Sequence, residues 1–176
     1  MDDGGFQLAI IGGGNMGAAL LGGLVDSGAF GSSDLVVVEV DDARRDTLSS
    51  LFPTVAVEAR TPSCTGAVLA VKPDGVAAAA SAAAAAGARR LLSIAAGVRL
   101  ATIETAAGPG VAVVRAMPNT PALVRLGACA IAAGTAADVD DVAWARSILE
   151  AVGTVDQVDE AALDAFTGVA GSGPAY

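Results

Sequence analysis

The chain has 176 residues, 53% of them hydrophobic, and a formal net charge of −9 at pH 7. This length and composition allow one domain of ordinary size with a sizeable buried core, and the negative charge argues against nucleic acids and anionic membranes as partners. The sequence contains no histidine, which excludes a Ser-His or Cys-His hydrolase and removes the commonest metal ligand.

The first predicted elements are a short strand, a glycine-rich turn and a helix. An apolar strand at Gln7–Ile11 precedes a helix-like stretch at Asn15–Ser27, and the turn between them reads G-x-G-x-x-G, with Gly12, Gly14 and Gly17 in the glycine places. The first glycine allows the tight turn, the second lets a pyrophosphate approach the backbone, and the third lets the helix pack against the strand. A glycine-rich loop without a ligand is the alternative, but the flanking strand and helix favour dinucleotide binding.

The next strand and helix bear on the choice of coenzyme. Glu39 lies near the end of a predicted strand at Leu35–Val40, 22 residues after the last glycine of the motif. A carboxylate there accepts hydrogen bonds from the adenine ribose and repels a 2′-phosphate, which favours NAD. Arg44 and Arg45 follow in a predicted helix at Asp41–Leu51 and could instead accommodate a 2′-phosphate or belong to a solvated helical turn. The sequence therefore does not decide between NAD and NADP as the coenzyme.

Strands and helices continue to alternate to the end of the chain. Further strands are predicted at Thr54–Val57, Ala67–Val71, Arg90–Ile94, Val111–Arg115, Ala128–Ala132 and Thr154–Val158, with Ala128–Ala132 as an edge strand. Further helices are predicted at Asp74–Ala86, Thr102–Ala107, Asp138–Val152 and Glu160–Phe166. The alanine-rich helix is expected to be solvent-facing or loosely packed. The alternation predicts an α/β fold with a Rossmann-like, doubly wound, mostly parallel sheet.

Three segments fall where predicted strands end, the edge at which such sheets bind ligands. Ala70–Pro73 contains Lys72, the only lysine of the chain, although an exposed lysine at a strand exit explains it equally well. Ser93–Gly97 ends a strand with small residues that leave room for a planar ring, or simply with a turn glycine. Arg115–Pro121 holds two prolines and Asn119, a donor and acceptor. We expect it to form a rigid loop at the nicotinamide and substrate end of the cleft.

The remaining features of the sequence concern its environment. Cys64 and Cys129 are far apart in the sequence and predict buried or half-buried thiols in a reducing cytoplasm, without a disulfide or metal site. No stretch is long and apolar enough to span a bilayer. The N-terminal residues lack the basic region of a secretory signal. We therefore expect a cytoplasmic protein with no metal and no membrane partner.

Five motifs together resemble those of pyrroline-5-carboxylate reductases, in the same order and approximate spacing. They are I-G-G-G-N-M-G at Ile11–Gly17, A-V-K-P at Ala70–Pro73, S-I-A-A-G at Ser93–Gly97, R-A-M-P-N-T-P-A-L at Arg115–Leu123 and V-A-G-S-G-P-A-Y at Val169–Tyr176. The first is shared by many dehydrogenases, whereas the strings M-P-N-T-P and G-S-G-P-A-Y are much more specific. The resemblance extends from residue 7 to residue 176.

The resemblance implies an NADPH- or NADH-dependent oxidoreductase that reduces the C=N bond of 1-pyrroline-5-carboxylate to L-proline, the last step of proline biosynthesis. An imine protonates readily in water, so no catalytic side chain is assigned, and none is expected to bind a metal. The implied coenzyme-binding residues are Ile11, Gly12, Gly13, Gly14, Asn15, Met16, Gly17, Glu39, Ala70, Val71, Lys72, Pro73, Ala95, Ala96, Gly97, Met117, Pro118 and Asn119. Where many relatives have a small hydroxyl residue after the second strand, this chain has Glu39.

The resemblance also implies a division of the chain. Residues 1–158 form the NAD(P)-binding Rossmann domain, and residues 159–176 are a linker and the first helix of an all-helical domain that forms a homodimer or higher oligomer and supplies most of the substrate pocket. The sequence stops at Tyr176, where that helix begins. We therefore expect the chain alone to bind coenzyme but to turn over slowly or not at all, and to expose apolar surface near its C-terminus with some tendency to self-associate.

Two other functions compete with this interpretation. Another small NAD(P)-dependent dehydrogenase, of the 3-hydroxyisobutyrate or coenzyme F420 type, would share the N-terminal glycine motif but is not expected to carry M-P-N-T-P. A non-catalytic NAD(P)-binding module that regulates a partner would need only the glycine motif and its sheet. Finding the helical domain encoded downstream would remove this second alternative.

Overall fold

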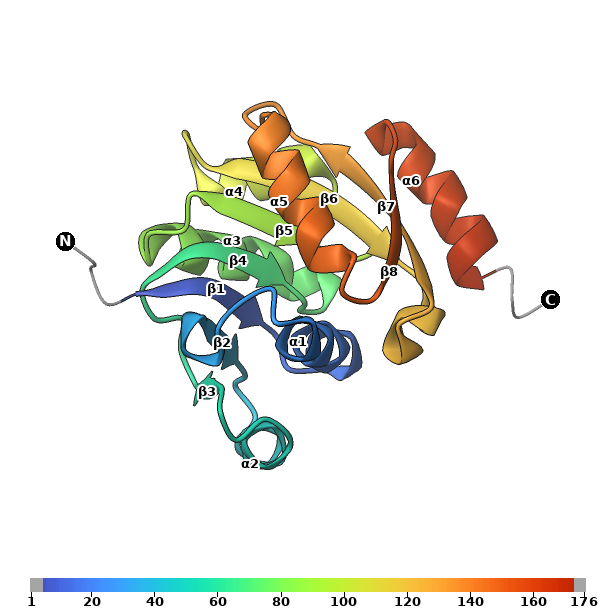
Figure 1. The fold of residues 1–176 in the computed structure, drawn as a ribbon. Helices are drawn as coiled ribbons and strands as arrows, with labels where there is room; N and C mark the ends of the chain where they lie inside the picture. The colour runs from blue at the N-terminus through green and yellow to red at the C-terminus, as the bar shows by residue number, and fades with distance from the viewer. Residues whose placement is uncertain (1–4, 173–176) are drawn as a thin grey trace.

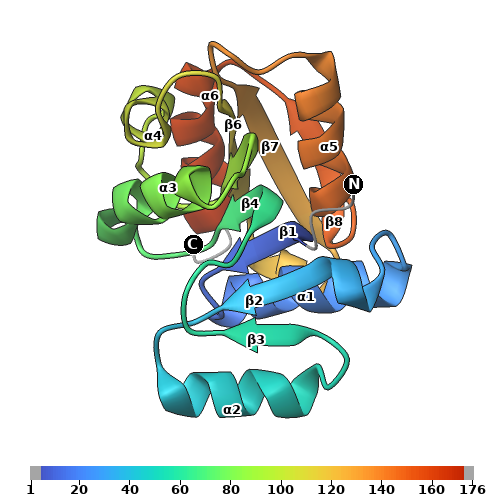
Figure 2. The ribbon, with the colours of Figure 1, turned by 90° about the vertical axis from the view of Figure 1, so that its left-hand side faces the viewer.

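The computed structural model describes residues 5–172, which form an eight-stranded sheet with helices on both faces (Figures 1 and 2). The strand order is β3-β2-β1-β4-β5-β6-β7-β8, and neighbours are parallel except for β6 and β7. The strands are β1 (Phe6–Ile11), β2 (Leu35–Val38), β3 (Ala56–Glu58), β4 (Cys64–Leu69), β5 (Arg90–Ser93), β6 (Ala112–Pro118), β7 (Gly127–Ala133) and β8 (Gly153–Gln157). The order changes direction at β1, so the space beside β1 is the topological switch point of a doubly wound sheet.

The helices cover the two faces of the sheet in two sets (Figure 2). One face carries α1 (Asn15–Ser27), α2 (Asp42–Leu51) and α5 (Val139–Leu149); the other carries α3 (Val76–Ala85), α4 (Leu100–Ala107) and α6 (Glu160–Phe166). Short helical turns lie at Ser32–Asp34, Pro73–Gly75 and Thr120–Val124, and a π-helical turn at Thr167–Ser172 follows α6. This arrangement confirms the predicted Rossmann-like α/β fold.

Side chains along the buried strands point alternately to the two faces of the sheet, and each face has its own hydrophobic core. In β1, Leu8 and Ile10 enter the core beneath α1 and α5, whereas Ala9 and Ile11 enter the core beneath α3 and α4. Successive side chains of a strand point to opposite faces, and both faces of a sheet covered by helices are apolar. This explains why the central strands read as continuous apolar runs rather than as alternating ones.

The structure corrects three details of the predicted elements. β6 continues to Pro118, so Met117 and Pro118 lie in a strand paired with β7 and not in a loop after it. β7 lies between β6 and β8 and is not an edge strand. The alanine-rich helix α3 buries one side, through Val76, Ala79, Ala80 and Ala83, against the sheet. The small methyl groups let this helix pack closely, so its lack of large residues does not leave it loosely attached.

Large apolar side chains are exposed in a few places on the described surface. Val169, near the C-terminal end of the described residues, is 77% exposed. Leu123, Val124 and Leu126 are exposed together in the connection between β6 and β7. Self-association through such residues stays a prediction. Within residues 5–172, none of the helices combines the length and apolar character needed to cross a membrane.

Candidate functional site: a cavity at the switch point of the sheet

A cavity of about 440 Å³ lies where β1, β2 and β4 end. Its lining residues are Ile11, Gly12, Gly14, Val38, Glu39, Val40, Ala70, Val71 and Lys72. Most of them come from the predicted coenzyme-binding set, and they come from three strands that are far apart in the sequence. Val38 and Val40 were not predicted. Their position on either side of Glu39 could have indicated them, because a ribose held by that carboxylate must also contact its neighbours.

The glycines of the motif have distinct physical reasons to be glycine. Gly12 has a φ of +106°, and a Cβ there would lie 2.5 Å from the carbonyl oxygen of Ala70. A Cβ on Gly17 would overlap the carbonyl oxygen of Gly12. Gly14 instead faces open space, with no atom within 4 Å of a Cβ placed there. The predicted tight turn at Gly12 and close helix packing at Gly17 are confirmed, and the space beside Gly14 suits a ligand that approaches the backbone.

The N-terminus of α1 points its free amide groups to this edge of the sheet. Its N-cap is Gly14, which has no side chain to accept hydrogen bonds from the first turn. The first N–H groups of a helix have no partner within the helix, and the helix dipole adds positive potential there. Gly14 and Asn15 are exposed, and Met16 is half-buried. These features fit a phosphate group.

Glu39 is bound to the glycine-rich turn. The residue directly follows β2, and its Oε2 accepts a hydrogen bond of 2.9 Å from the N–H of Gly13. Its Oε1 accepts a hydrogen bond of 3.1 Å from the N–H of Asp41. Gly13 itself is buried against Leu48, whose Cδ1 would overlap any Cβ at that position. The carboxylate is therefore held beside the glycine-rich turn by two donors.

The two arginines of α2 are tied to main-chain oxygens of the same region. The Nε of Arg44 donates to the carbonyl oxygen of Gly13 at 2.6 Å, and Nη1 of Arg45 donates to the carbonyl oxygen of Glu39 at 2.8 Å. Arg45 also forms an ion pair with Asp42. In the structure the arginines connect α2 to the turns that follow β1 and β2, and a role toward a 2′-phosphate stays a prediction.

The segment after β4 closes the other side of the cavity. The N–H of Ala70 donates to the carbonyl oxygen of Ile11 at 2.8 Å, which extends the β1–β4 pairing past the end of the strands. Lys72 is exposed at the rim, and Pro73 begins the helical turn that precedes α3. The backbone of this segment lies against Gly12. A side chain on Gly12 would thus close the cavity from within.

The remaining predicted residues lie at the same sheet edge but outside the cavity lining. Ala95 is buried, whereas Ala96 and Gly97 are exposed after β5. Met117 and Asn119, at the end of β6, are half-buried. The Oδ1 of Asn119 accepts a hydrogen bond of 2.9 Å from the N–H of Ala128, which closes the β6–β7 connection and leaves the amide NH₂ group as the donor that could face a ligand.

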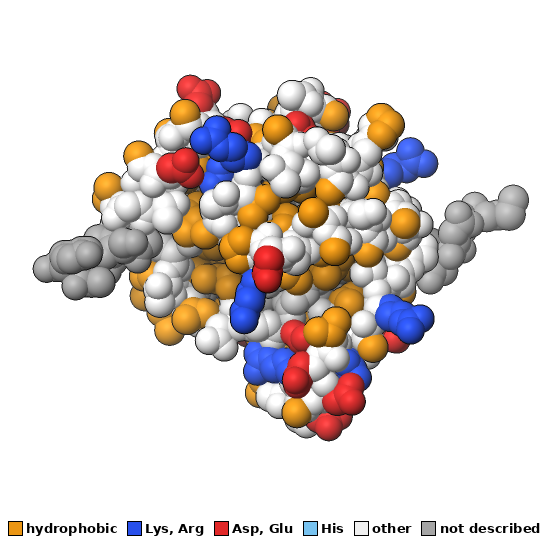
Figure 3. All heavy atoms as spheres, turned by 180° about the vertical axis from the view of Figure 1, so that it is seen from behind, with side chains coloured by type: hydrophobic (Ala, Val, Ile, Leu, Met, Phe, Trp, Pro, Cys, Tyr) orange, Lys and Arg blue, Asp and Glu red, His pale blue; other side chains and the backbone are white. Residues whose placement is uncertain are grey.

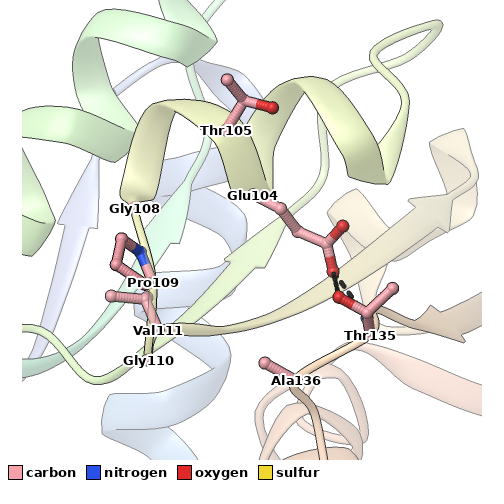
Figure 4. Close-up of a pocket in the computed structure, with 8 residues that line it drawn as sticks. All are labelled: Glu104, Thr105, Gly108, Pro109, Gly110, Val111, Thr135 and Ala136. Carbon is pink, nitrogen blue, oxygen red and sulfur yellow. Dashed lines mark hydrogen bonds between the residues drawn. The ribbon is translucent and has the colours of Figure 1, made fainter.

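A second cavity, of about 270 Å³, lies at the opposite edge of the sheet (Figure 4). There Glu104 of α4 accepts hydrogen bonds from the N–H and the hydroxyl of Thr135, at 2.5 and 2.9 Å. The carboxylate fastens the turn after β7 to α4. This cavity is at the amino ends of the parallel strands, away from the edge where doubly wound sheets bind ligands.

Neither cysteine lies at the cavity, and both are free. Burial raises the pKa of the Cys64 thiol, and burial raises the pKa of the Cys129 thiol to about 11. Both thiols therefore stay protonated near neutral pH and are poor nucleophiles. In the part of the chain that the structure describes, no cluster of three or more His, Cys, Asp or Glu residues is arranged to hold a metal ion.

Comparison with known proteins connects this cavity to a family. The family model described as NADP oxidoreductase coenzyme F420-dependent matches residues 7–97, from β1 to the segment that follows β5. The chain belongs to this family. The match spans every strand that lines the cavity.

Curated relatives cover nearly the whole chain. A pyrroline-5-carboxylate reductase from Synechocystis is 43% identical over 174 residues, covering 97% of this chain and 65% of that protein. One from Mycobacterium tuberculosis is 39% identical over 180 residues, covering 97% of this chain and 61% of that protein. Among solved structures, a pyrroline-5-carboxylate reductase from Coxiella burnetii superposes with a TM-score of 0.89 at 31% identity, over 97% of this chain and 66% of that one. The resemblance drawn from the motifs is confirmed, and the chain spans less than two thirds of the length of these relatives.

Proposed function

We propose that this chain is the coenzyme-binding part of a pyrroline-5-carboxylate reductase, which reduces 1-pyrroline-5-carboxylate to L-proline with NADPH or NADH. The observation that carries the proposal is the cavity at the switch point, in which Gly12, Gly14 and Glu39 meet the segment after β4. A glycine-rich turn, an uncapped helix N-terminus and a ribose-facing carboxylate together are what a dinucleotide needs. The identity of 43% to a reductase over almost the entire chain supports this reaction.

In this proposal different residues bind different parts of the coenzyme. Residues 11–17 hold the pyrophosphate, and Glu39 holds the adenine ribose. Ala70–Pro73 and Ala95–Gly97 border the nicotinamide side, where small side chains leave room for a flat ring. When bound, the reduced nicotinamide supplies the hydride that the imine carbon accepts. The chain itself binds the coenzyme in one orientation and keeps water away from the face of the nicotinamide on which the substrate lies.

The end of β6 is the proposed substrate side of the site. Met117 and Pro118 are held in a strand by their pairing with Ala130 and Cys129 of β7. Asn119 follows with its amide NH₂ available to a polar ligand atom. No acid or base is assigned among these residues, because the imine takes up its proton in water before it accepts the hydride. Their role is to position the substrate and exclude water.

Domain organisation, assembly and location are part of the same proposal. We propose that residues 1–158 are the coenzyme domain and that 159–176 begin a helical domain through which the complete protein forms a homodimer or higher oligomer. Within that second stretch, α6 packs on the sheet through the buried Leu163. Residues 173–176, which include the end of the G-S-G-P-A-Y motif, lie outside the described residues. A cytoplasmic location agrees with two free cysteines.

One observation supports the competing proposal of another small dehydrogenase. The matching family model is named for coenzyme F420-dependent enzymes. That match ends at residue 97, before the M-P-N-T-P string at the end of β6. It therefore covers segments proposed to bind the coenzyme and not the proposed substrate side. The reductase proposal is preferred because its relatives extend over both halves.

The experiment that tests the proposal has two parts. The first follows the fluorescence of NADH and NADPH as each is titrated with the 176-residue chain; saturable binding of at least one is expected. The second follows the oxidation of the bound coenzyme by the complete gene product on addition of 1-pyrroline-5-carboxylate, with L-proline as the product identified. Coenzyme binding without any reaction with this imine would exclude the reductase and favour another dehydrogenase or a non-catalytic module.

A further inference from the structure

We infer that Glu39 makes this chain select NADH over NADPH, an inference that rests on the proposed function. The two coenzymes differ only by a phosphate on the 2′-hydroxyl of the adenine ribose. Selection therefore depends on the groups that surround that hydroxyl, which in this fold lie just after β2. In this chain those groups are Glu39 and Val40, both of which line the cavity.

The Glu39 carboxylate suits a ribose with two free hydroxyls. Its two oxygens accept one hydrogen bond each from Gly13 and Asp41. A carboxylate has about four acceptor positions, so lone pairs are left for the ribose hydroxyl groups. A 2′-phosphate carries between about one and two negative charges and cannot donate in the same way. At contact distance from Glu39 it meets a like charge, and the repulsion corresponds to roughly tenfold or more in affinity.

Glu39 is also held where it is. Turning the carboxylate away to admit a phosphate would leave the N–H of the buried Gly13 without its acceptor, 2.9 Å away. A buried donor that loses its partner is costly. Arg45 holds the carbonyl oxygen of Glu39, which restrains the main chain at the same residue. The acidic side chain is thus a fixed part of the turn and not a mobile surface group.

The two arginines of α2 lie next to Glu39 and the glycine-rich turn. Arg44 and Arg45 are half-buried and donate to main-chain oxygens of Gly13 and Glu39. Arg45 is further neutralised by Asp42. Figure 3 shows acidic and basic side chains mixed together over the lower lobe that α2 forms, with no purely basic patch there. Among the described residues, Arg45 is paired with a carboxylate, whereas Arg44 is held through Nε alone.

Lys72 is the only Lys or Arg among the residues that line the cavity, and it follows a different strand from Glu39. It follows β4, and β1 lies between β4 and β2. Two strand spacings, roughly 10 Å, therefore separate the ends of β2 and β4. Of the two charged lining residues, Glu39 is therefore the nearer to the proposed position of the adenine ribose.

The test compares dissociation constants of NADH and NADPH for the chain and two variants. Glu39→Gln keeps the size of the side chain and one acceptor but removes the charge. Glu150→Gln is the matched control: Glu150 is exposed at the C-terminal end of α5, outside the cavity lining, and its loss changes the net charge equally. Both variants are checked for folding by circular dichroism, and binding is followed by coenzyme fluorescence.

The wild-type chain is expected to bind NADH about tenfold or more tightly than NADPH. Glu39→Gln should reduce that preference at least about fivefold, mainly by tightening the binding of NADPH, while Glu150→Gln leaves it within about twofold. Equal or tighter binding of NADPH by the wild type, or an unchanged ratio in Glu39→Gln, would overturn the inference while leaving the proposed function intact. Failure to bind either coenzyme would overturn both.

Discussion

At the scale of single residues, the candidate site depends on three glycines, which have no side chain, and on the Glu39 carboxylate, which two hydrogen bonds hold in place. Gly12 and Gly17 leave room for each other and for Ala70, so the turn after β1 can close tightly. Gly14 leaves its outer side open to a ligand. Glu39 then fastens this turn from the neighbouring strand through the N–H of Gly13. The shape of the candidate site at this turn is therefore set by backbone atoms, which only glycine exposes in this way.

The substitution Gly17→Ala should destabilise the chain and impair coenzyme binding. The new methyl group overlaps the carbonyl oxygen of Gly12, and main-chain atoms cannot yield cheaply, so we expect a loss of about 1–3 kcal/mol in unfolding free energy. The matched control is Gly22→Ala in the same helix, where a Cβ would lie 3.6 Å from the ring of Phe52. That change should be neutral or stabilise by up to about 1 kcal/mol. Urea unfolding and NADH titration of both variants check this; equal behaviour would contradict it.

The thiol of Cys129 should make stability depend on alkaline pH. Burial raises its pKa to about 11 in the folded chain, whereas an exposed thiol ionises near about 8.5. Between these values the unfolded chain loses the thiol proton and the folded chain keeps it, so rising pH favours unfolding. Its contribution is complete below about pH 8.5 and is lost towards about pH 11. Urea unfolding across this range should show a shallower decline in Cys129→Ala than in the wild type, and parallel curves would refute the assignment.

At the scale of elements, α6 is attached to the sheet by a buried arginine. Arg115 of β6 is 3% exposed, and its guanidinium pairs with Glu160 at 3.1 Å and Asp164 at 3.2 Å. Glu160 also accepts a hydrogen bond of 2.7 Å from the N–H of Leu100, at the start of α4. One carboxylate thus joins α6, β6 and α4. Because β6 ends at the proposed substrate side, this cluster also links the C-terminal helix to the site.

Replacing Arg115 should loosen α6 selectively. Arg115→Met removes both ion pairs and leaves the half-buried Glu160 with only the Leu100 amide, so we expect a loss of about 2–4 kcal/mol. Asp164→Asn is the comparison, because the Asp164 side chain is 66% exposed and such pairs contribute at most about 1 kcal/mol. Hydrogen exchange of the amides at 160–166 should quicken strongly in the first variant and slightly in the second. Unchanged exchange in Arg115→Met would mean that packing by Leu163 alone holds the helix.

At the scale of the whole molecule, the doubly wound sheet brings distant segments to one cavity. The turns after β1, β2 and β4 are contributed by residues near positions 12, 39 and 70. Parallel strands place their carboxyl ends together, and the change of direction at β1 opens a space between them. The antiparallel turn from β6 to β7 then carries the chain back across the same edge. A ligand in this cavity would hold several elements together.

Coenzyme should accordingly stabilise the whole chain. At a free concentration of NADH about 100 times its dissociation constant, binding to the folded state adds about 2.7 kcal/mol. For a chain of this size that corresponds to a rise of roughly 5–10 °C in Tm. Thermal unfolding with and without NADH measures it, and Gly17→Ala, with its distorted turn, should respond less. An unchanged Tm at saturating NADH and NADPH would argue against the proposed site.

Much of the fold was predictable because its elements are marked locally. Every predicted strand and helix is present, and α1 has the predicted bounds, Asn15–Ser27. Glycine punctuation and apolar runs carry this information without reference to the rest of the chain. The extent of β6 was not predictable, since Pro118 looks like the start of a loop. It remains in the strand because β7, nine or more residues later, pairs with it in the reverse direction.

The α/β class, the order of the elements, the glycine-rich turn and the resemblance to pyrroline-5-carboxylate reductases could be predicted from the amino-acid sequence, because each depends on residues that are close together in the chain. The partners of the charged residues could not, because they come from distant segments that meet only in the folded sheet. Glu39 with Gly13, Arg44 with Gly13, and Arg115 with Glu160 are separated by 26, 31 and 45 residues. Such contacts arise when strands of one sheet are ordered side by side, and strand order depends on the packing of the whole chain.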